Sequence, residues 1–136
     1  MVTEDYVSFE TAKLLKEKGF ECEKDSITAM YNEIGKFHPL STAVDEYYYD
    51  YNDFDEYDYV APTLQMAMKW LREVHKIDIT IDPHEVVEGY EYEVKNNWIY
   101  QFHLCQNRNY LFSRDIDTSY ENCAEVAIKY CLENLV

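Results

Sequence analysis

The chain has 136 residues, with 27 acidic side chains against 12 basic ones and a formal net charge of −15, and its length predicts a single domain, residues 1–136. The charge excludes a general nucleic-acid binder and opposes adsorption to anionic membranes, because both kinds of affinity depend on lysine and arginine. No apolar run approaches the ~18 residues of a membrane-spanning helix and no secretory signal is visible, so we expect a cytoplasmic protein.

The first predicted element is a helix over residues 7–20. Ser8 is expected to cap its beginning, and Gly19 is expected to end it in the left-handed conformation. Its apolar residues share one face, and the opposite face carries the lysines that we expect in water: Lys13, Lys16 and Lys18.

A short hairpin is predicted next. Residues 27–31 and 36–40 have the composition of strands and flank a turn that contains Gly35. His38, beside a proline, is expected to be an exposed turn residue, as is His84 further along the chain.

An acidic, tyrosine-rich stretch follows over residues 45–58, with seven acids and six aromatic residues. Its charge density opposes compaction, whereas its rings can anchor it on the body or on a partner. We therefore expect an exposed, adaptable loop over residues 45–60 and hypothesise that it contacts a protein partner. The residues assigned to this contact are Asp45, Glu46, Tyr47, Tyr48, Asp50, Tyr51, Asp53, Asp55, Glu56, Tyr57 and Asp58.

The clearest helix is predicted over residues 63–75, after Pro62. Its buried face follows three- and four-residue spacing and consists of Leu64, Ala67, Met68, Leu71 and Val74. Aromatic and β-branched residues then predict antiparallel strands over residues 77–82, 90–94, 97–104 and 110–112.

The last helix is predicted to begin with a capping box formed by Thr118 and Glu121. One continuous inner stripe follows: Tyr120, Cys123, Ala124, Ala127, Ile128, Cys131 and Leu135. The expected fold class is α+β, with an antiparallel sheet of about four to six strands and three helices packed mainly on one face.

Three blocks of the chain resemble a group of small proteins found in gut Bacteroidetes genomes and in their phages or mobile elements. They are residues 6–20, 61–75 and 127–135, with the sequences YVSFETAKLLKEKGF, APTLQMAMKWLREVH and AIKYCLENL. This group has no known activity, so the resemblance implies an origin in a phage or mobile element and no particular chemistry.

Metal and cofactor chemistry has little support in the sequence. The four cysteines form no C-x-x-C pair, as zinc and thioredoxin-like sites require. Carboxylates two residues apart, as at Asp53 and Asp55, suggest a calcium loop, but residues 45–58 lack the glycine that an EF-hand needs. We therefore expect no metal and no cofactor.

Two further alternatives come from the strands. Cys105 and His103 lie two apart on one predicted strand and therefore share a face, which is the one arrangement that suits a cysteine nucleophile and its base. Trp98, Tyr100 and Phe102 share the other face, which suits association with a partner or a second copy of the chain.

Only the order of the predicted elements favours nucleic-acid recognition. The order helix, three strands, helix from residue 63 onward resembles the double-stranded RNA-binding domain. Residues 61–136 nevertheless hold 12 acids against 7 bases, which opposes the phosphate contacts of that domain.

The leading interpretation is a non-enzymatic, cytoplasmic accessory protein of phage or mobile-element type. Its acidic tyrosine-rich segment, which imitates phosphates and flat bases, would bind a basic site on an unknown protein. The alternative is a small enzyme or metal-dependent protein that uses the face of Cys105 and His103.

Overall fold

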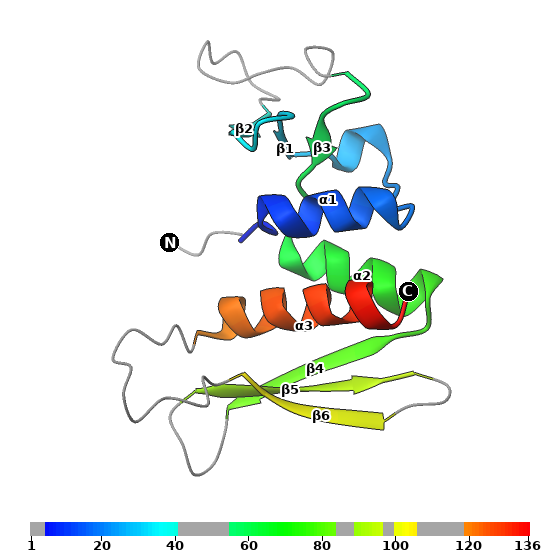
Figure 1. The fold of residues 1–136 in the computed structure, drawn as a ribbon, viewed down its shortest axis with the longest axis vertical. Helices are drawn as coiled ribbons and strands as arrows, with labels where there is room; N and C mark the ends of the chain where they lie inside the picture. Colours follow the sequence, from blue (N-terminus) through cyan, green and yellow to red (C-terminus); the bar gives the residue numbers. More distant parts are fainter. Residues whose placement is uncertain (1–4, 41–54, 84–88, 97–99, 106–118) are drawn as a thin grey trace. The chain divides into compact units, whose positions relative to one another are not determined.

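A computed structural model describes residues 5–40, 55–83, 89–96, 100–105 and 119–136 (Figure 1), with the backbone alone for residues 25 and 100–105. The contacts divide the chain into two compact units, Met1–Met66 and Ala67–Val136, and each unit is described by itself below. The single domain expected from the length stays a prediction.

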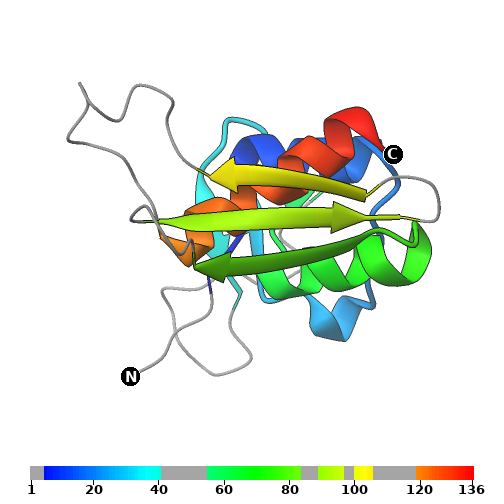
Figure 2. The ribbon, with the colours of Figure 1, turned by 90° about the horizontal axis from the view of Figure 1, so that it is seen from below.

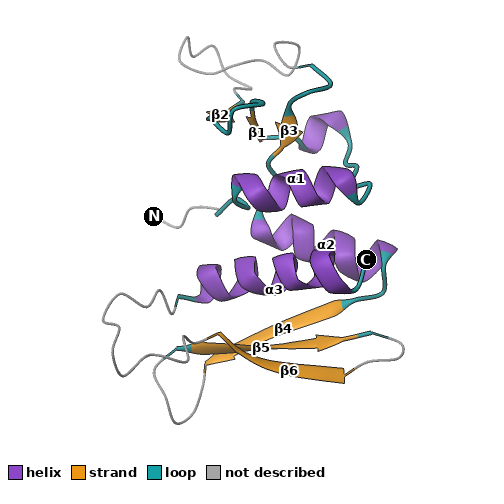
Figure 3. Ribbon diagram, in the orientation of Figure 1, coloured by secondary structure: helices purple, strands orange, loops and turns teal. Residues whose placement is uncertain are grey.

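The expected α+β class is confirmed, but the single larger sheet is wrong. The described residues form three α-helices and two separate antiparallel sheets (Figure 3), each of three strands rather than four to six. The two sheets are separate because no strand of one pairs with a strand of the other among the described residues. A short strand that follows the acidic segment completes the first sheet, and three strands that are consecutive in sequence form the second.

Helix α1, Phe9–Glu17, has the ends that the sequence predicts. The Ser8 hydroxyl accepts a hydrogen bond from the Thr11 amide at 3.2 Å, and Gly19 has a φ of +89°. Ala12 and Leu15 are buried, whereas Lys13 and Lys16 are exposed. A short 3₁₀-helix, Lys24–Ser26, follows α1.

The predicted hairpin is also confirmed, as strands β1, Ala29–Tyr31, and β2, Phe37–Pro39. The Asn32 side-chain oxygen orders the turn by accepting from the Ile34 amide at 3.0 Å and from the Lys36 amide at 2.9 Å. Such a bond between an asparagine and its own following backbone is a common way to build a tight turn.

Two expectations in this first unit are wrong. His38 is not an exposed turn residue: it is only 7% exposed, because it lies within β2, paired with Met30 of β1. The last two residues of the expected loop form strand β3, Tyr59–Val60, which pairs with β1 on the side away from β2. The order of this sheet is therefore β2-β1-β3, and α1 contacts β3.

Helix α2, Leu64–Val74, contains the predicted buried stripe except at its end. Val74 is 57% exposed, so its assignment to the core is wrong. The helix ends there, Lys76 takes a left-handed φ of +58°, and Ile77 is the next buried residue.

The second unit contains the sheet β4, Asp78–Pro83, β5, Tyr90–Lys95, and β6, Tyr100–Cys105. Figure 2 shows the three strands side by side, with β5 in the middle, and adjacent strands are antiparallel. Helix α3 contacts β4 and β5, and it includes Tyr130, whose ring lies 6.3 Å from that of Tyr92.

Helix α3, Tyr120–Asn134, begins one residue later than predicted. The capping residue is Ser119, whose hydroxyl accepts from the Asn122 amide at 3.1 Å, whereas Thr118 of the expected capping box lies outside the described residues. Glu121 still lies in the first turn, where its negative charge interacts favourably with the helix dipole. The predicted inner stripe is confirmed at Cys123, Ala124, Ala127, Ile128 and Cys131, and Leu132 is buried in addition. The two ends of the predicted stripe, Tyr120 and Leu135, are only partly buried.

Several expected features lie outside the described residues. They are residues 45–54 of the acidic segment, His84, Trp98, the strand at 110–112 and Thr118.

Two glycines with nearly the same left-handed φ allow a test of packing in the first unit. A Cβ atom on Gly19 meets nothing within 4 Å, whereas one on Gly35, with a φ of +92°, lies 3.0 Å from the Phe9 ring. Gly19→Ala is expected to cost about 1 kcal/mol of unfolding free energy, from backbone strain alone. Gly35→Ala is expected to cost clearly more, measured by urea unfolding followed by circular dichroism. Equal losses in the two variants would show that the Phe9 ring moves aside freely.

Candidate functional site

The described end of the acidic segment, residues 55–58, is a hydrogen-bonded turn. The Asp58 carboxylate accepts from the Asp55 amide, and the Asp55 carboxylate accepts from the Tyr57 amide, each at 2.8 Å. The Asp58 amide in turn donates to the Asp55 carbonyl at 3.2 Å. Two of the segment's acids therefore organise their own backbone.

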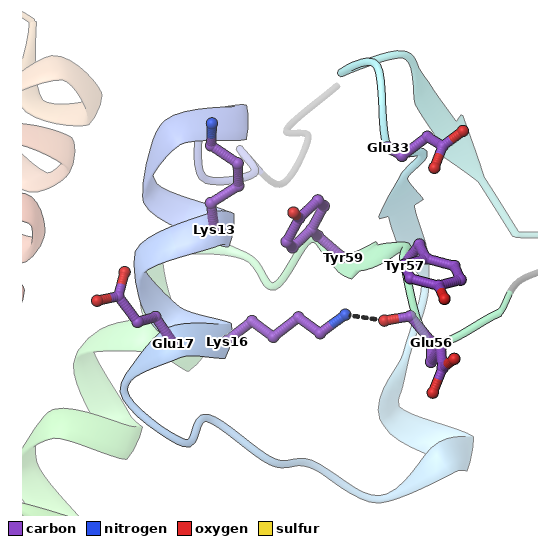
Figure 4. A pocket seen from close by; sticks show the side chains of 7 residues that line it. All are labelled: Lys13, Lys16, Glu17, Glu33, Glu56, Tyr57 and Tyr59. Carbon is purple, nitrogen blue, oxygen red and sulfur yellow. Dashed lines mark hydrogen bonds between the residues drawn. The ribbon is translucent and has the colours of Figure 1, made fainter.

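Lys16, which lies on α1, also stabilises this turn. Its ammonium group donates to the carbonyl oxygens of Glu56 and Asp58, the second at 2.9 Å, as Figure 4 shows for Glu56. The same group lies 4.8 Å from the centre of the Tyr59 ring. Because both acceptors are carbonyl oxygens, Lys16 fixes the backbone of the turn and leaves the Glu56 carboxylate to other partners.

The outer side of the turn is accessible. Asp55 and Glu56 are exposed, and Tyr57 is 61% exposed. Within the part of the chain that the structure describes, no ion pair involves Asp55 or Glu56. The turn thus presents a large ring beside carboxylates that form no ion pair with another described residue, as the contact hypothesis requires.

A cavity of about 500 Å³ lies between this turn and α1. Figure 4 shows its walls: one comes from α1, one from the turn between β1 and β2, and one from the residues leading into β3. The lining residues are Lys13, Lys16, Glu17, Glu33, Glu56, Tyr57 and Tyr59.

Aromatic packing fixes the floor of this region. The Phe9 ring lies 5.6 Å from the Tyr59 ring and 5.5 Å from the Tyr31 ring, and the Lys13 ammonium lies 4.8 Å above Phe9. Aromatic and cation–π contacts of this kind stabilise defined ring orientations.

The structure brings four of the eleven predicted contact residues together: Asp55, Glu56, Tyr57 and Asp58. The other seven, Asp45, Glu46, Tyr47, Tyr48, Asp50, Tyr51 and Asp53, lie outside the described residues. The sequence interpretation missed the cavity's partners from other elements, namely Lys13, Lys16, Glu17, Glu33 and Tyr59. The one available signal was the lysine-rich face of the first helix, interpreted as facing solvent.

The alternative site on β6 has only its backbone described. Its register pairs His103 with Tyr92 and Cys105 with Tyr90. No group of three or more histidine, cysteine or acidic residues in the described ranges is arranged to hold a metal ion. Within the same ranges, no helix has the length and hydropathy needed to cross a membrane.

The thiols of Cys22 and Cys131 are poor nucleophiles at neutral pH. Burial raises the pKa of Cys131 from 9.0 to about 12, and burial also raises the pKa of Cys22. The thiolate is the nucleophilic form of cysteine, so a raised pKa lowers reactivity. Cys123 and Cys131 are buried on α3, in agreement with their expected place in the core.

Comparison of the chain with protein-family models, with curated proteins and with solved structures finds no match. The site is therefore interpreted from its own geometry and charge.

The Lys16 contact can be tested with Lys16→Met, which keeps an apolar stem and removes the ammonium group. Loss of its exposed hydrogen bonds is expected to cost the turn about 1 kcal/mol, which accelerates amide hydrogen exchange at residues 55–58 about fivefold. Lys13→Met is the matched control on the same helix and should leave these amides unchanged. Unchanged exchange in the Lys16 variant would contradict the assigned contact.

The buried Cys131 thiol predicts a loss of stability in alkali. Above pH 9 the unfolded chain ionises this thiol, whereas the folded chain keeps the proton until about pH 12. The stability that the raised pKa of Cys131 contributes is therefore complete below pH 9, and it falls as the pH rises from 9 towards 12. Cys131→Ala should show a shallower decrease of unfolding free energy across this range than the unsubstituted protein, measured by urea unfolding at each pH. Parallel curves would contradict the shift.

Proposed function

We propose that this chain is a non-enzymatic protein-binding factor that uses its acidic tyrosine-rich segment to bind a basic surface of another protein. The observation that carries the proposal is the turn at residues 55–58. There a ring that is 61% exposed lies beside carboxylates without ion-pair partners among the described residues.

The physical basis is electrostatic and steric. A chain with a formal net charge of −15 attracts basic partners over long range, which speeds their encounter. Tyrosine side chains then supply contact area at small entropic cost, because each has only two side-chain torsions. The hydrogen bonds of Lys16 and of the two aspartates hold the turn before any partner arrives, which lowers the ordering cost of binding.

The resemblance of three sequence blocks to proteins of Bacteroidetes phages and mobile elements supports the proposed setting. In that setting the factor acts in the cytoplasm as an accessory protein of such an element, and the bound partner is a basic protein of the host.

The proposal is tested by neutralising the seven acids between residues 45 and 58 to asparagine and glutamine. These amides keep the shape of the side chains, and asparagine keeps the oxygen that the turn requires. The formal charge falls from −15 to −8. Binding of a fluorescein-labelled peptide of alternating arginine and serine, measured by fluorescence anisotropy, is expected to weaken at least about tenfold. Binding by the unsubstituted protein should also weaken strongly as salt is raised.

The control variant has the same net charge with the segment intact. It carries amides in place of seven exposed acids elsewhere in the chain: Asp5, Glu21, Glu23, Glu73, Asp78, Asp82 and Glu133. If the control loses as much affinity as the segment variant, net charge alone explains binding and the proposal is wrong.

A further inference from the structure

We propose that the cavity beside α1 receives an arginine side chain of the basic partner, bound by the carboxylates of Glu33 and Glu56 and by the ring of Tyr57. This inference rests on the proposed function, and it adds to it a defined subsite and a preferred side chain. It also brings in Glu33, which lies outside the segment assigned from sequence.

The cavity is large enough to receive a side chain. Its volume of about 500 Å³ falls within the ~300–1,000 Å³ range of ligand pockets in proteins. Its lining combines two tyrosine rings with three carboxylates and two ammonium groups. The site is thus a hollow with aromatic walls in addition to its acidic groups.

The two lysines of the cavity are already engaged within the protein. The Lys16 ammonium is bound by two backbone carbonyls and lies over the Tyr59 ring, and the Lys13 ammonium lies over the Phe9 ring. Neither lysine forms an ion pair with another residue that the structure describes. The glutamates of the cavity therefore keep their negative charge for a partner.

The wall opposite α1 is where the available groups gather. Figure 4 shows Glu33, Glu56 and Tyr57 on that wall, whereas both lysines extend from α1. Glu33 and Glu56 are exposed, and Tyr57 presents its ring. The negative groups that an incoming cation can meet thus lie on the side away from the two lysines.

A guanidinium group suits this wall better than an ammonium group. It is planar and weakly hydrated, so it stacks on a tyrosine ring, and its five donors can serve two carboxylates together. An ammonium group has three donors and is more strongly hydrated. The cavity therefore selects arginine over lysine.

The experiment uses the full chain and three labelled peptides that alternate serine with arginine, with lysine or with citrulline, the neutral isostere of arginine. We expect the arginine peptide to bind several-fold more tightly than the lysine peptide and the citrulline peptide to bind most weakly. Glu33→Gln and Tyr57→Leu are each expected to weaken binding of the arginine peptide about fivefold or more. Glu21→Gln, an exposed acid of the same unit outside the cavity, is the matched control and should change it less than twofold.

Lys13→Met tests whether the cavity binds a cation. Removing the positive charge of Lys13 should tighten binding of the arginine peptide, because that charge repels a guanidinium group, whereas weaker binding would overturn the inference. Circular dichroism and thermal melting establish that each variant is folded.

The remaining outcomes separate this inference from the function on which it rests. If neutralising residues 45–58 abolishes binding while Glu33→Gln and Tyr57→Leu have no effect, the arginine subsite is wrong and the proposed function stands. If the lysine and arginine peptides bind equally, the preference for guanidinium is wrong. If the unsubstituted protein binds none of the basic peptides, both proposals are wrong.

Discussion

The contact between the Lys16 ammonium and the backbone of residues 56–58 is the constraint on which the candidate site depends. It joins positions 40 and 42 residues apart in sequence, and it uses carbonyl oxygens rather than carboxylates. A charged group thereby fixes an acidic turn in place without neutralising it. The cavity between α1 and the turn exists because this contact holds one wall against the other, while Phe9 and Tyr59 fill the space beneath.

The acidic segment combines two properties that oppose each other in most chains. Dense like charge favours extension and raises the free energy of a compact state, whereas an ordered binding surface has to be held still. In the described turn the conflict is resolved locally, because the aspartates accept hydrogen bonds from their own backbone. A cationic partner would relieve the remaining repulsion, so its binding is linked to a gain in stability of the folded chain.

Local rules predicted the helices and the hairpin well, because their signals are short-range. The Ser8 cap, the Gly19 stop and the Asn32 turn each involve residues within a few positions of one another. Errors arose where a distant partner decides the outcome. Strand β3 has only two residues and forms through pairing with β1, so it has no hydrophobic periodicity in the sequence. The sequence therefore did not indicate a separate first sheet, and a single sheet was predicted where the structure has two. The acceptors of Lys16 are backbone atoms, which every residue has, so composition contains no sign of that contact.

The outer position of β4 in its sheet has a consequence for how the protein behaves at high concentration. An outer strand has backbone groups available to a strand of another molecule, which is a common route to fibres. Here Asp78 and Asp82 are exposed along β4, and Pro83, which lacks an amide hydrogen, ends it. A second copy that approached this side would meet repulsion between like charges and a missing donor. This outer strand is thus protected against polymerisation by the same excess of acids that distinguishes the chain.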